Sequence, residues 1–102
     1  MSFNRKRRLK RPEITFTEQC GKGTVVRSMT GRSRGRLFVV TDVFIDKYGK
    51  LYAYVCDGER RTVSNPKLKA AAHLEVITVN TFTALTDEDA KGLTAKIGNL
   101  ED

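Results

Sequence analysis

The sequence predicts a mainly β domain: a small five-stranded barrel with a basic N-terminal arm and a short C-terminal helix. Two observations lead to this fold class. Short runs rich in Val, Ile, Phe, Tyr and Thr follow one another between residues 23 and 79, separated by turn signals. The length of 102 residues suits one small domain with one core. An apolar fraction of 39% permits that core, and a charged fraction of 30% indicates a highly charged surface.

Five runs have the composition of short strands, and they cover residues 23–28, 36–45, 51–56, 59–63 and 73–79. The run 36–45 is apolar on both faces, as in a strand that is central or is long and bent. Asp57-Gly58 is the strongest hairpin signal, so 59–63 is expected to return beside 51–56. Residues 66–71 are expected to form one helical turn. Because the connections are tight, the strands should pair antiparallel, which favours an SH3-like barrel over residues 13–80.

Basic residues gather towards the N-terminus. The net charge is +7, and residues 1–36 hold eleven Lys and Arg against two Glu, whereas residues 37–102 hold eight against ten acidic residues. A surplus of this kind favours a polyanion as partner. Residues 1–12 have too little apolar content to fold alone, so we expect a disordered arm that orders on a partner; the alternative is a solvated tail that aids solubility. The cations of this arm that we expect to contact such a polyanion are Arg5, Lys6, Arg7 and Arg8.

Residues 81–102 are expected to form a tail with a short helix over 87–97. Thr86 fits the N-cap, and three acidic residues follow it in the first turn, where the helix dipole favours negative charge. Gly98 fits the position just after the end of a helix. The apolar side chains of the helix share one face, which we expect to pack on the barrel.

The stretch 29–36, MTGRSRGR, places three arginines and two glycines between two β runs. It lacks the Gly-Lys-Ser/Thr of a phosphate-binding P-loop, and it contains no dinucleotide-binding glycine fingerprint. A disordered Arg-Gly tract would recur many times, whereas this pattern occurs once. We therefore predict a turn that displays Arg32, Arg34 and Arg36, because burying an unpaired guanidinium is costly. Displayed guanidinium groups suit phosphate oxygens.

No catalytic constellation is visible, so the protein is not expected to be an enzyme or to need a cofactor or metal. His73 is the only histidine, and we expect it to be a packed or surface residue. Cys20 and Cys56 lack the spacing of a zinc site and are expected to be ordinary thiols. No secretory signal is visible, and no apolar run approaches the roughly 18 residues that cross a membrane. We expect a cytoplasmic protein without a membrane partner.

The string GTVVRSMTGRSRGRLFVVTDV resembles a KOW motif, in which an apolar pair and a basic, glycine-containing loop precede a β strand. Its continuation through Asp57-Gly58, Asn65-Pro66-Lys67 and His73-Leu74 is similar to small bacterial KOW-domain RNA-binding proteins, which are related to the archaeal and eukaryotic large-subunit ribosomal proteins of the fourteen-e group. The resemblance covers about residues 22–77. It implies an SH3-like barrel that binds ribosomal or other structured RNA through loop 30–36. The implied RNA-binding residues are Arg27, Thr30, Gly31, Arg32, Arg34, Gly35 and Arg36, with Arg60, Arg61, Lys67 and Lys69 in a second basic stretch.

We therefore expect a monomeric, ribosome-associated protein whose loop contacts RNA phosphates. Tyr52 and Tyr54 are candidates for stacking on bases, but the pattern around them favours half-buried strand aromatics. The alternative function is a protein-interaction module of a transcription or translation complex, with ribosomal or transcription proteins as partners. KOW domains of transcription elongation factors contact polymerase, and the acidic helix would then be the partner-facing surface.

Overall fold

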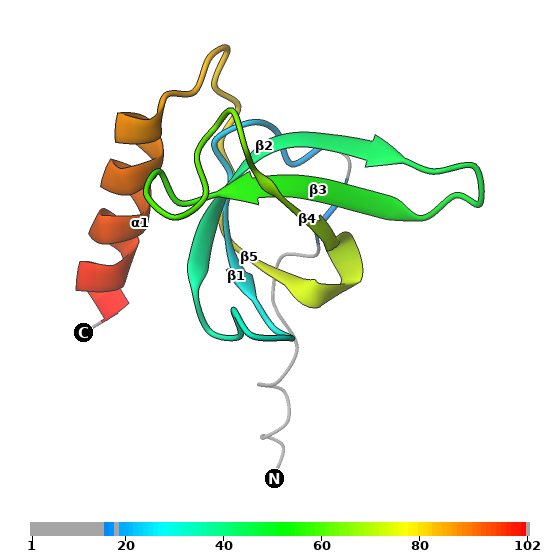
Figure 1. Cartoon of the computed structure of the whole chain (residues 1–102), viewed down its shortest axis with the longest axis horizontal. Helices are drawn as coiled ribbons and strands as arrows, with labels where there is room; N and C mark the ends of the chain where they lie inside the picture. The colour runs from blue at the N-terminus through cyan, green and yellow to red at the C-terminus, as the bar shows by residue number, and fades with distance from the viewer. Residues whose placement is uncertain (1–15, 18, 102) are drawn as a thin grey trace, which may run out of the picture.

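The computed structural model, which describes residues 16–17 and 19–101, contains one five-stranded antiparallel sheet and one C-terminal helix (Figure 1). The strands lie in the order β4-β3-β2-β1-β5. Their bounds are Val25–Ser28 for β1, Leu37–Ile45 for β2, Leu51–Cys56 for β3, Lys67–Ala70 for β4 and Leu74–Thr78 for β5. The predicted mainly β class, strand number and antiparallel pairing are confirmed. The predicted arm over residues 1–12, with Arg5, Lys6, Arg7 and Arg8, lies outside the described residues.

Strand β2 is long because it pairs with β1 over its first part and with β3 over most of its length. The register between β2 and β3 shifts between Val40 and Asp42, which marks a bulge. The extra residue reverses the alternation of side chains, so Val40 and Val43 pack against the same core. Phe44 lies on the opposite face, where its ring stacks on Tyr52. A bulge bends a strand, in agreement with the long, bent strand suggested by the sequence.

Apolar side chains pack on both faces of the sheet. The inner core lies on one face, and the helix-side core lies between the other face and the helix α1 (Asp87–Glu101). Val25 and Val26 are neighbours in β1 and are both fully buried, yet they belong to different cores. The buried members of the inner core are Phe16, Cys20, Val26, Phe38, Val40, Ala53, Val55, Ala71, Leu74 and Val76, and those of the helix-side core are Val25, Val39, Cys56, Leu85 and Ala90.

The two cysteines are free, and both are buried. Cys20 belongs to the inner core and Cys56 to the helix-side core. Burial raises the pKa of the Cys56 thiol to about 11, and the negative charge of Asp87 adds to this increase.

The predicted return strand over 59–63 and the predicted helical turn over 66–71 are both wrong. After Asp57-Gly58 the chain makes a turn in which the Arg61 carbonyl accepts hydrogen bonds from the Asp57 and Gly58 amides, at 3.0 and 2.9 Å. The Asp57 carboxylate also accepts from the Glu59 and Arg61 amides, at 2.9 and 3.0 Å. These hydrogen bonds occupy the backbone groups that residues 59–63 would need in order to pair with β3 as a strand. The partner of β3 is instead β4 (67–70), and the helical turn is a 3₁₀ segment, η2 (Ala71–His73), directly after it.

The five-stranded sheet is not closed. Strands β4 and β5 lie at its two edges, and η2 joins them in sequence. Strand β5 pairs with β1, so the chain crosses from one edge to the other in three residues (Figure 1). Such a short crossing requires a strongly curled sheet, because three residues span at most ~11 Å.

Helix α1 begins where the sequence predicts but extends beyond the predicted end at residue 97. Thr86 and Asp89 form a reciprocal cap: the Asp89 amide donates to Thr86 Oγ1 at 3.1 Å, and the Thr86 amide donates to Asp89 Oδ2 at 3.2 Å. Gly98 lies inside the helix and is absent from the glycines with positive φ, so it is not the terminating residue. Leu93 and Ile97 pack on the helix-side core, and this contact holds the last turns in place.

Gly58 is the point of closest approach between the Asp57 turn and α1. Its φ is +84°, and a Cβ built on it would overlap the Asp87 carbonyl oxygen and lie 3.0 Å from the Lys91 amide nitrogen. Gly49, at the β2–β3 turn, has the same φ of +84° but no atom within 4 Å of its Cβ position. The two glycines therefore share a backbone constraint and differ in packing.

We predict that Gly58→Ala destabilises the fold more than Gly49→Ala. The strained backbone costs roughly 1–2 kcal/mol in both variants. Overlap with α1 adds about 1–3 kcal/mol in Gly58→Ala alone. Urea unfolding followed by circular dichroism measures both, and equal losses would show that α1 does not press against Gly58.

Candidate nucleic-acid interface

The connection between β1 and β2 is an ordered loop over residues 29–36. Its base is closed by two hydrogen bonds: the Ser28 amide donates to the Arg36 carbonyl at 3.0 Å, and the Gly35 amide donates to the Ser28 carbonyl at 2.7 Å. Inside the loop, the Arg34 amide bonds the Gly31 carbonyl at 3.2 Å. Gly31 and Gly35 have φ of +77° and +86°, which other residues rarely adopt. The glycines therefore allow the chain to turn twice, as predicted.

Two buried serines hold the loop from inside. Ser28 is fully buried, and its hydroxyl lies 3.1 Å from both the Thr30 carbonyl and the Ser33 hydroxyl. Ser33 is 4% exposed although it stands between two arginines. Because Ser33 points inward, the side chains of Arg32 and Arg34 on either side of it are exposed to solvent. Neither serine was predicted to support the loop. For Ser33 the available signal was its position as a small polar residue between two arginines.

The two lysines of β4 contact the loop from the side. Lys67 Nζ lies 3.3 Å from Ser33 Oγ, and Lys69 Nζ lies 3.2 Å from the Thr30 carbonyl oxygen. Burial lowers the pKa of Lys69, and the positive charge of Lys67 lowers it further. The structure thus brings Lys67 and Lys69 together with the loop, although more than thirty residues separate them in sequence.

Arg27 supports the loop rather than extending from it. Its Nη1 donates to the Gly35 carbonyl at 3.2 Å, and its Nε lies 3.6 Å from Glu75 Oε1 on β5. Both side chains of this ion pair are partly exposed, so the pair contributes at most about 1 kcal/mol. Arg27 therefore braces the second glycine turn from the neighbouring strand.

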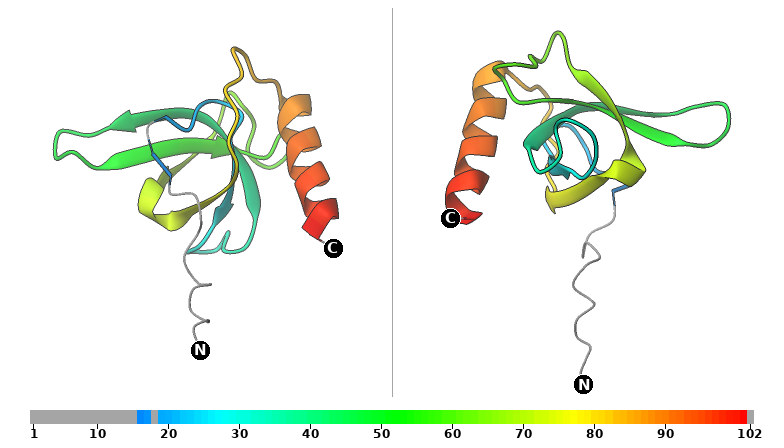
Figure 2. Two further views of the ribbon diagram at one scale, coloured as in Figure 1. Left: turned by 180° about the vertical axis from the view of Figure 1, so that it is seen from behind. Right: turned by 60° about the horizontal axis from the view of Figure 1, so that its bottom comes forward.

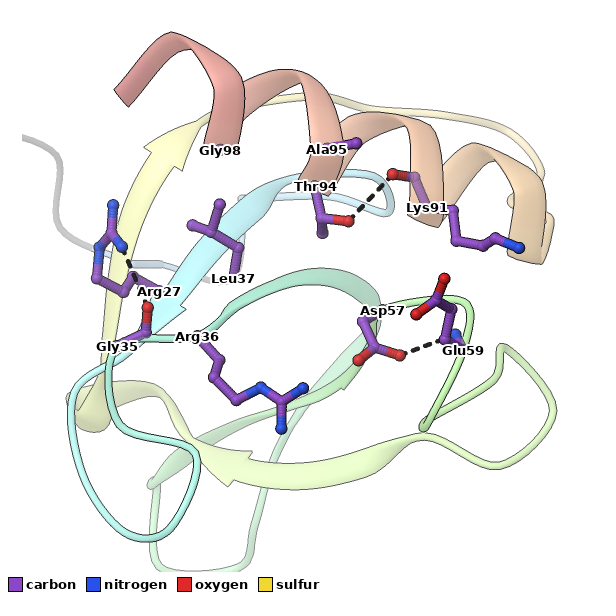
Figure 3. Close-up of a pocket in the computed structure, with 10 residues that line it drawn as sticks. All are labelled: Arg27, Gly35, Arg36, Leu37, Asp57, Glu59, Lys91, Thr94, Ala95 and Gly98. Carbon is purple, nitrogen blue, oxygen red and sulfur yellow. Dashed lines mark hydrogen bonds between the residues drawn. The ribbon is translucent and has the colours of Figure 1, made fainter. Parts of the chain in front are cut away.

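Arg36 differs from the other two loop arginines in its surroundings. It lines an open pocket of about 650 Å³ between the end of the loop, the Asp57 turn and α1 (Figure 3). Arg27 and Lys91 also line this pocket, together with the acidic residues Asp57 and Glu59. The charge of Arg36 helps to lower the pKa of Asp57, so the two side chains interact electrostatically. Part of the positive potential of Arg36 is therefore offset within the protein.

Arg60 and Arg61, the remaining predicted contacts, lie in the Asp57 turn. Arg60 is exposed and Arg61 is half-buried. Within the described part of the chain, neither side chain forms a hydrogen bond or ion pair with the loop. The structure thus shows no direct contact that joins these two arginines to the group formed by the loop and the β4 lysines.

Over residues 16–17 and 19–101, no helix combines the length and apolar composition needed to cross a membrane. No group of three or more His, Cys, Asp or Glu side chains in the same residues is placed to hold a metal ion.

No family model matches the chain, and none of the curated proteins matches it.

We predict that the ionisation of the Asp57 carboxylate makes the stability of the fold depend on pH. Burial alone would raise its pKa, but hydrogen bonds from the Arg61, Glu59 and Arg60 amides and the charge of Arg36 outweigh burial and lower it. The ionised carboxylate therefore stabilises the fold above its ordinary pKa of about 3.9, and this contribution disappears as pH falls through the lower folded-state value.

Asp57→Asn keeps an oxygen acceptor and removes the charge, so it serves as the reference for this linkage. The free energy of unfolding of the native protein should exceed that of the variant at pH 6, and the difference should shrink below about pH 4. Urea titrations at several pH values measure this difference. A gap that stays constant down to pH 2 would contradict a lowered pKa.

Proposed function

We propose that the protein binds structured RNA, with ribosomal RNA as the target, through the loop over residues 29–36 and the lysines of β4. One observation carries this proposal: Lys67 and Lys69 reach the same loop on which Arg32 and Arg34 are exposed. Four cations from separate parts of the chain thereby share one surface. Their density suits closely spaced phosphates, and the hydrogen bonds within the loop reduce the backbone entropy that is lost on binding.

We propose further that the sheet is of the SH3-like barrel class and that the loop is a KOW loop. Three features support this assignment. The basic loop connects β1 and β2, a 3₁₀ segment joins the edge strand β4 to β5, and β5 pairs with β1. The resemblance of residues 22–77 to KOW proteins adds to this support, because the basic loop of a KOW motif also precedes a β strand.

Each part of the surface has a distinct chemical task in this proposal. Arg32 and Arg34 bind phosphate oxygens, because a guanidinium offers two parallel donors. Lys67 and Lys69 fix the loop and add positive charge beside it. The arm over residues 1–12 supplies further, sequence-independent phosphate contacts. The protein acts as a cytoplasmic, ribosome-associated monomer without catalytic activity.

We predict that Arg32→Ala/Arg34→Ala weakens binding to a ribosomal RNA fragment. Each phosphate contact that is lost should cost roughly tenfold in affinity at about 0.1 M salt and lower the slope of log K against log salt by about one. Arg36→Ala should cost less, because Asp57 already offsets its charge. Fluorescence anisotropy at four salt concentrations measures affinity and slope together.

Lys91→Ala/Lys96→Ala on α1 removes the same net charge from exposed positions and is the matched control. It should bind RNA within a factor of about three of the native protein, because it changes only long-range potential. Equal losses in the two double variants would show that net charge, not the loop, determines binding.

We predict that the protein sediments with the large ribosomal subunit in a sucrose gradient at low salt and leaves it at high salt. The reason is that its contacts are mainly with phosphates, which salt screens. The Arg32→Ala/Arg34→Ala variant should leave the subunit at a lower salt concentration. Protein partners that survive nuclease digestion, with no association with the subunit, would favour a protein-interaction module instead.

A further inference from the structure

Three aromatic rings form a continuous group on the β2–β3 hairpin. Phe44 stacks on Tyr52, with ring centroids 5.4 Å apart and planes 13° from parallel. The ring of Phe44 also lies 5.7 Å from that of Tyr54, at 33°. Phe44 is 39% exposed, and both tyrosines are half-buried. We call Phe44, Tyr52 and Tyr54 the aromatic platform.

The platform is on the same face of the sheet as α1 but beyond the reach of the helix. Tyr52, Tyr54 and Cys56 share a face of β3, and only Cys56 belongs to the helix-side core. The hairpin projects from the sheet on the side away from α1 (Figures 1 and 2). None of the three platform residues belongs to either core, so their rings pack on one another and not on α1 or the inner core.

Positive charge borders the platform. Lys50 Nζ lies 5.5 Å from the centroid of the Tyr52 ring, and Lys47 Nζ lies 5.4 Å from that of Tyr48, which is 82% exposed at the tip of the hairpin. Asp46, the acidic residue of the tip, accepts hydrogen bonds from the Tyr48 and Lys50 amides and so closes the turn. Exposed rings beside lysines are complementary to a partner that carries both planar groups and negative charge. A nucleic-acid strand has this combination.

A pocket of about 450 Å³ adjoins the platform at Tyr54. Val63 and Pro66 give it apolar walls, and Lys22, Thr41 and Asp42 give it polar ones. The volume is ample for one nucleobase and falls in the range of ordinary ligand pockets. A base that enters it meets the Tyr54 side chain, a cation for its phosphate and a carboxylate of the kind that accepts hydrogen bonds from base amino groups.

We propose that the aromatic platform binds unpaired RNA bases by stacking, with one base in the pocket beside Tyr54. This inference rests on the proposed RNA-binding function and adds a second surface to it. The loop over residues 29–36 binds phosphates of structured RNA, whereas the hairpin selects segments whose bases are not already stacked in a duplex.

The composition of the chain supplies a specific probe. It contains three tyrosines and no tryptophan, and all three tyrosines, at positions 48, 52 and 54, lie on this hairpin. Intrinsic tyrosine fluorescence therefore reports on the hairpin alone. Oligoadenylate should quench it on binding, and a perfectly paired RNA duplex of equal phosphate count should bind without quenching it.

Phe44→Leu/Tyr52→Leu removes two rings and keeps their apolar bulk. Its affinity for oligoadenylate should fall roughly tenfold or more, with the salt slope unchanged. Tyr52→Phe keeps the ring and is the matched control, which should bind like the native protein. Because the platform lies outside both cores, circular dichroism and urea unfolding should show that all variants fold.

The outcomes separate this inference from the proposed function. In one outcome, both RNAs bind, and the Arg32→Ala/Arg34→Ala variant binds both of them more weakly. If tyrosine emission then does not change on binding and the Phe44→Leu/Tyr52→Leu variant binds normally, the proposed function stands but the platform is not a base-stacking surface. If neither RNA binds the native protein, the proposed function fails as well. Loss of a nuclease-resistant protein partner in the leucine variant, with no quenching by RNA, would also overturn the inference and assign the hairpin to protein docking.

Discussion

The structure depends on the burial of β1 between two partner strands. Strand β1 pairs with β2 over Val25 to Arg27 on one side, and all four of its residues pair with β5 on the other. Val25 belongs to the helix-side core and Val26 to the inner core, and both are fully buried. Full burial of a valine contributes roughly 1.5–3 kcal/mol. The same strand ends at Ser28, whose hydroxyl fixes the basic loop, so the stability of the core also fixes the geometry of the loop.

Much of this arrangement was predictable from local sequence. Short runs rich in Val, Ile, Leu, Phe and Tyr predict β1, β2, β3 and β5, and Thr86 marks the start of α1. The fourth strand was assigned wrongly because its alternating Lys-Leu-Lys-Ala pattern is weak, while Asp57-Gly58 is a strong local signal for an immediate hairpin. The carboxylate of Asp57 accepts hydrogen bonds from two amides of its own turn, and the next strand that pairs with β3 begins only at Lys67. Whether this stretch forms a closed turn or a hairpin with β3 depends on hydrogen bonds that only the three-dimensional structure shows.

The candidate site was likewise predictable in part. Two glycines and three arginines in six positions indicate a basic turn, and its order is explained by Ser28 and Ser33, which resemble any surface serine in sequence. The contact of Lys67 and Lys69 with the loop depends on the curl of the sheet, which cannot be predicted from any short segment of the sequence. Arg36 and Arg34 are equivalent in sequence, but only Arg36 faces acidic residues from the Asp57 turn. Phe44 was missed because the bulge after Val40 reverses which side chains share a face.

The positions of the two thiols have a consequence for observing how this domain opens. Cys20 and Cys56 lie in cores on opposite faces of the sheet, and the thiolate is the form that reacts with alkylating reagents. With its pKa near 11, Cys56 is almost wholly protonated at neutral pH as well as covered. Modification of Cys56 ahead of Cys20 would record detachment of α1 from an intact sheet, and the reverse order would record release of the segment around Phe16. The order in which the two native thiols are modified therefore reports which of the two cores opens first.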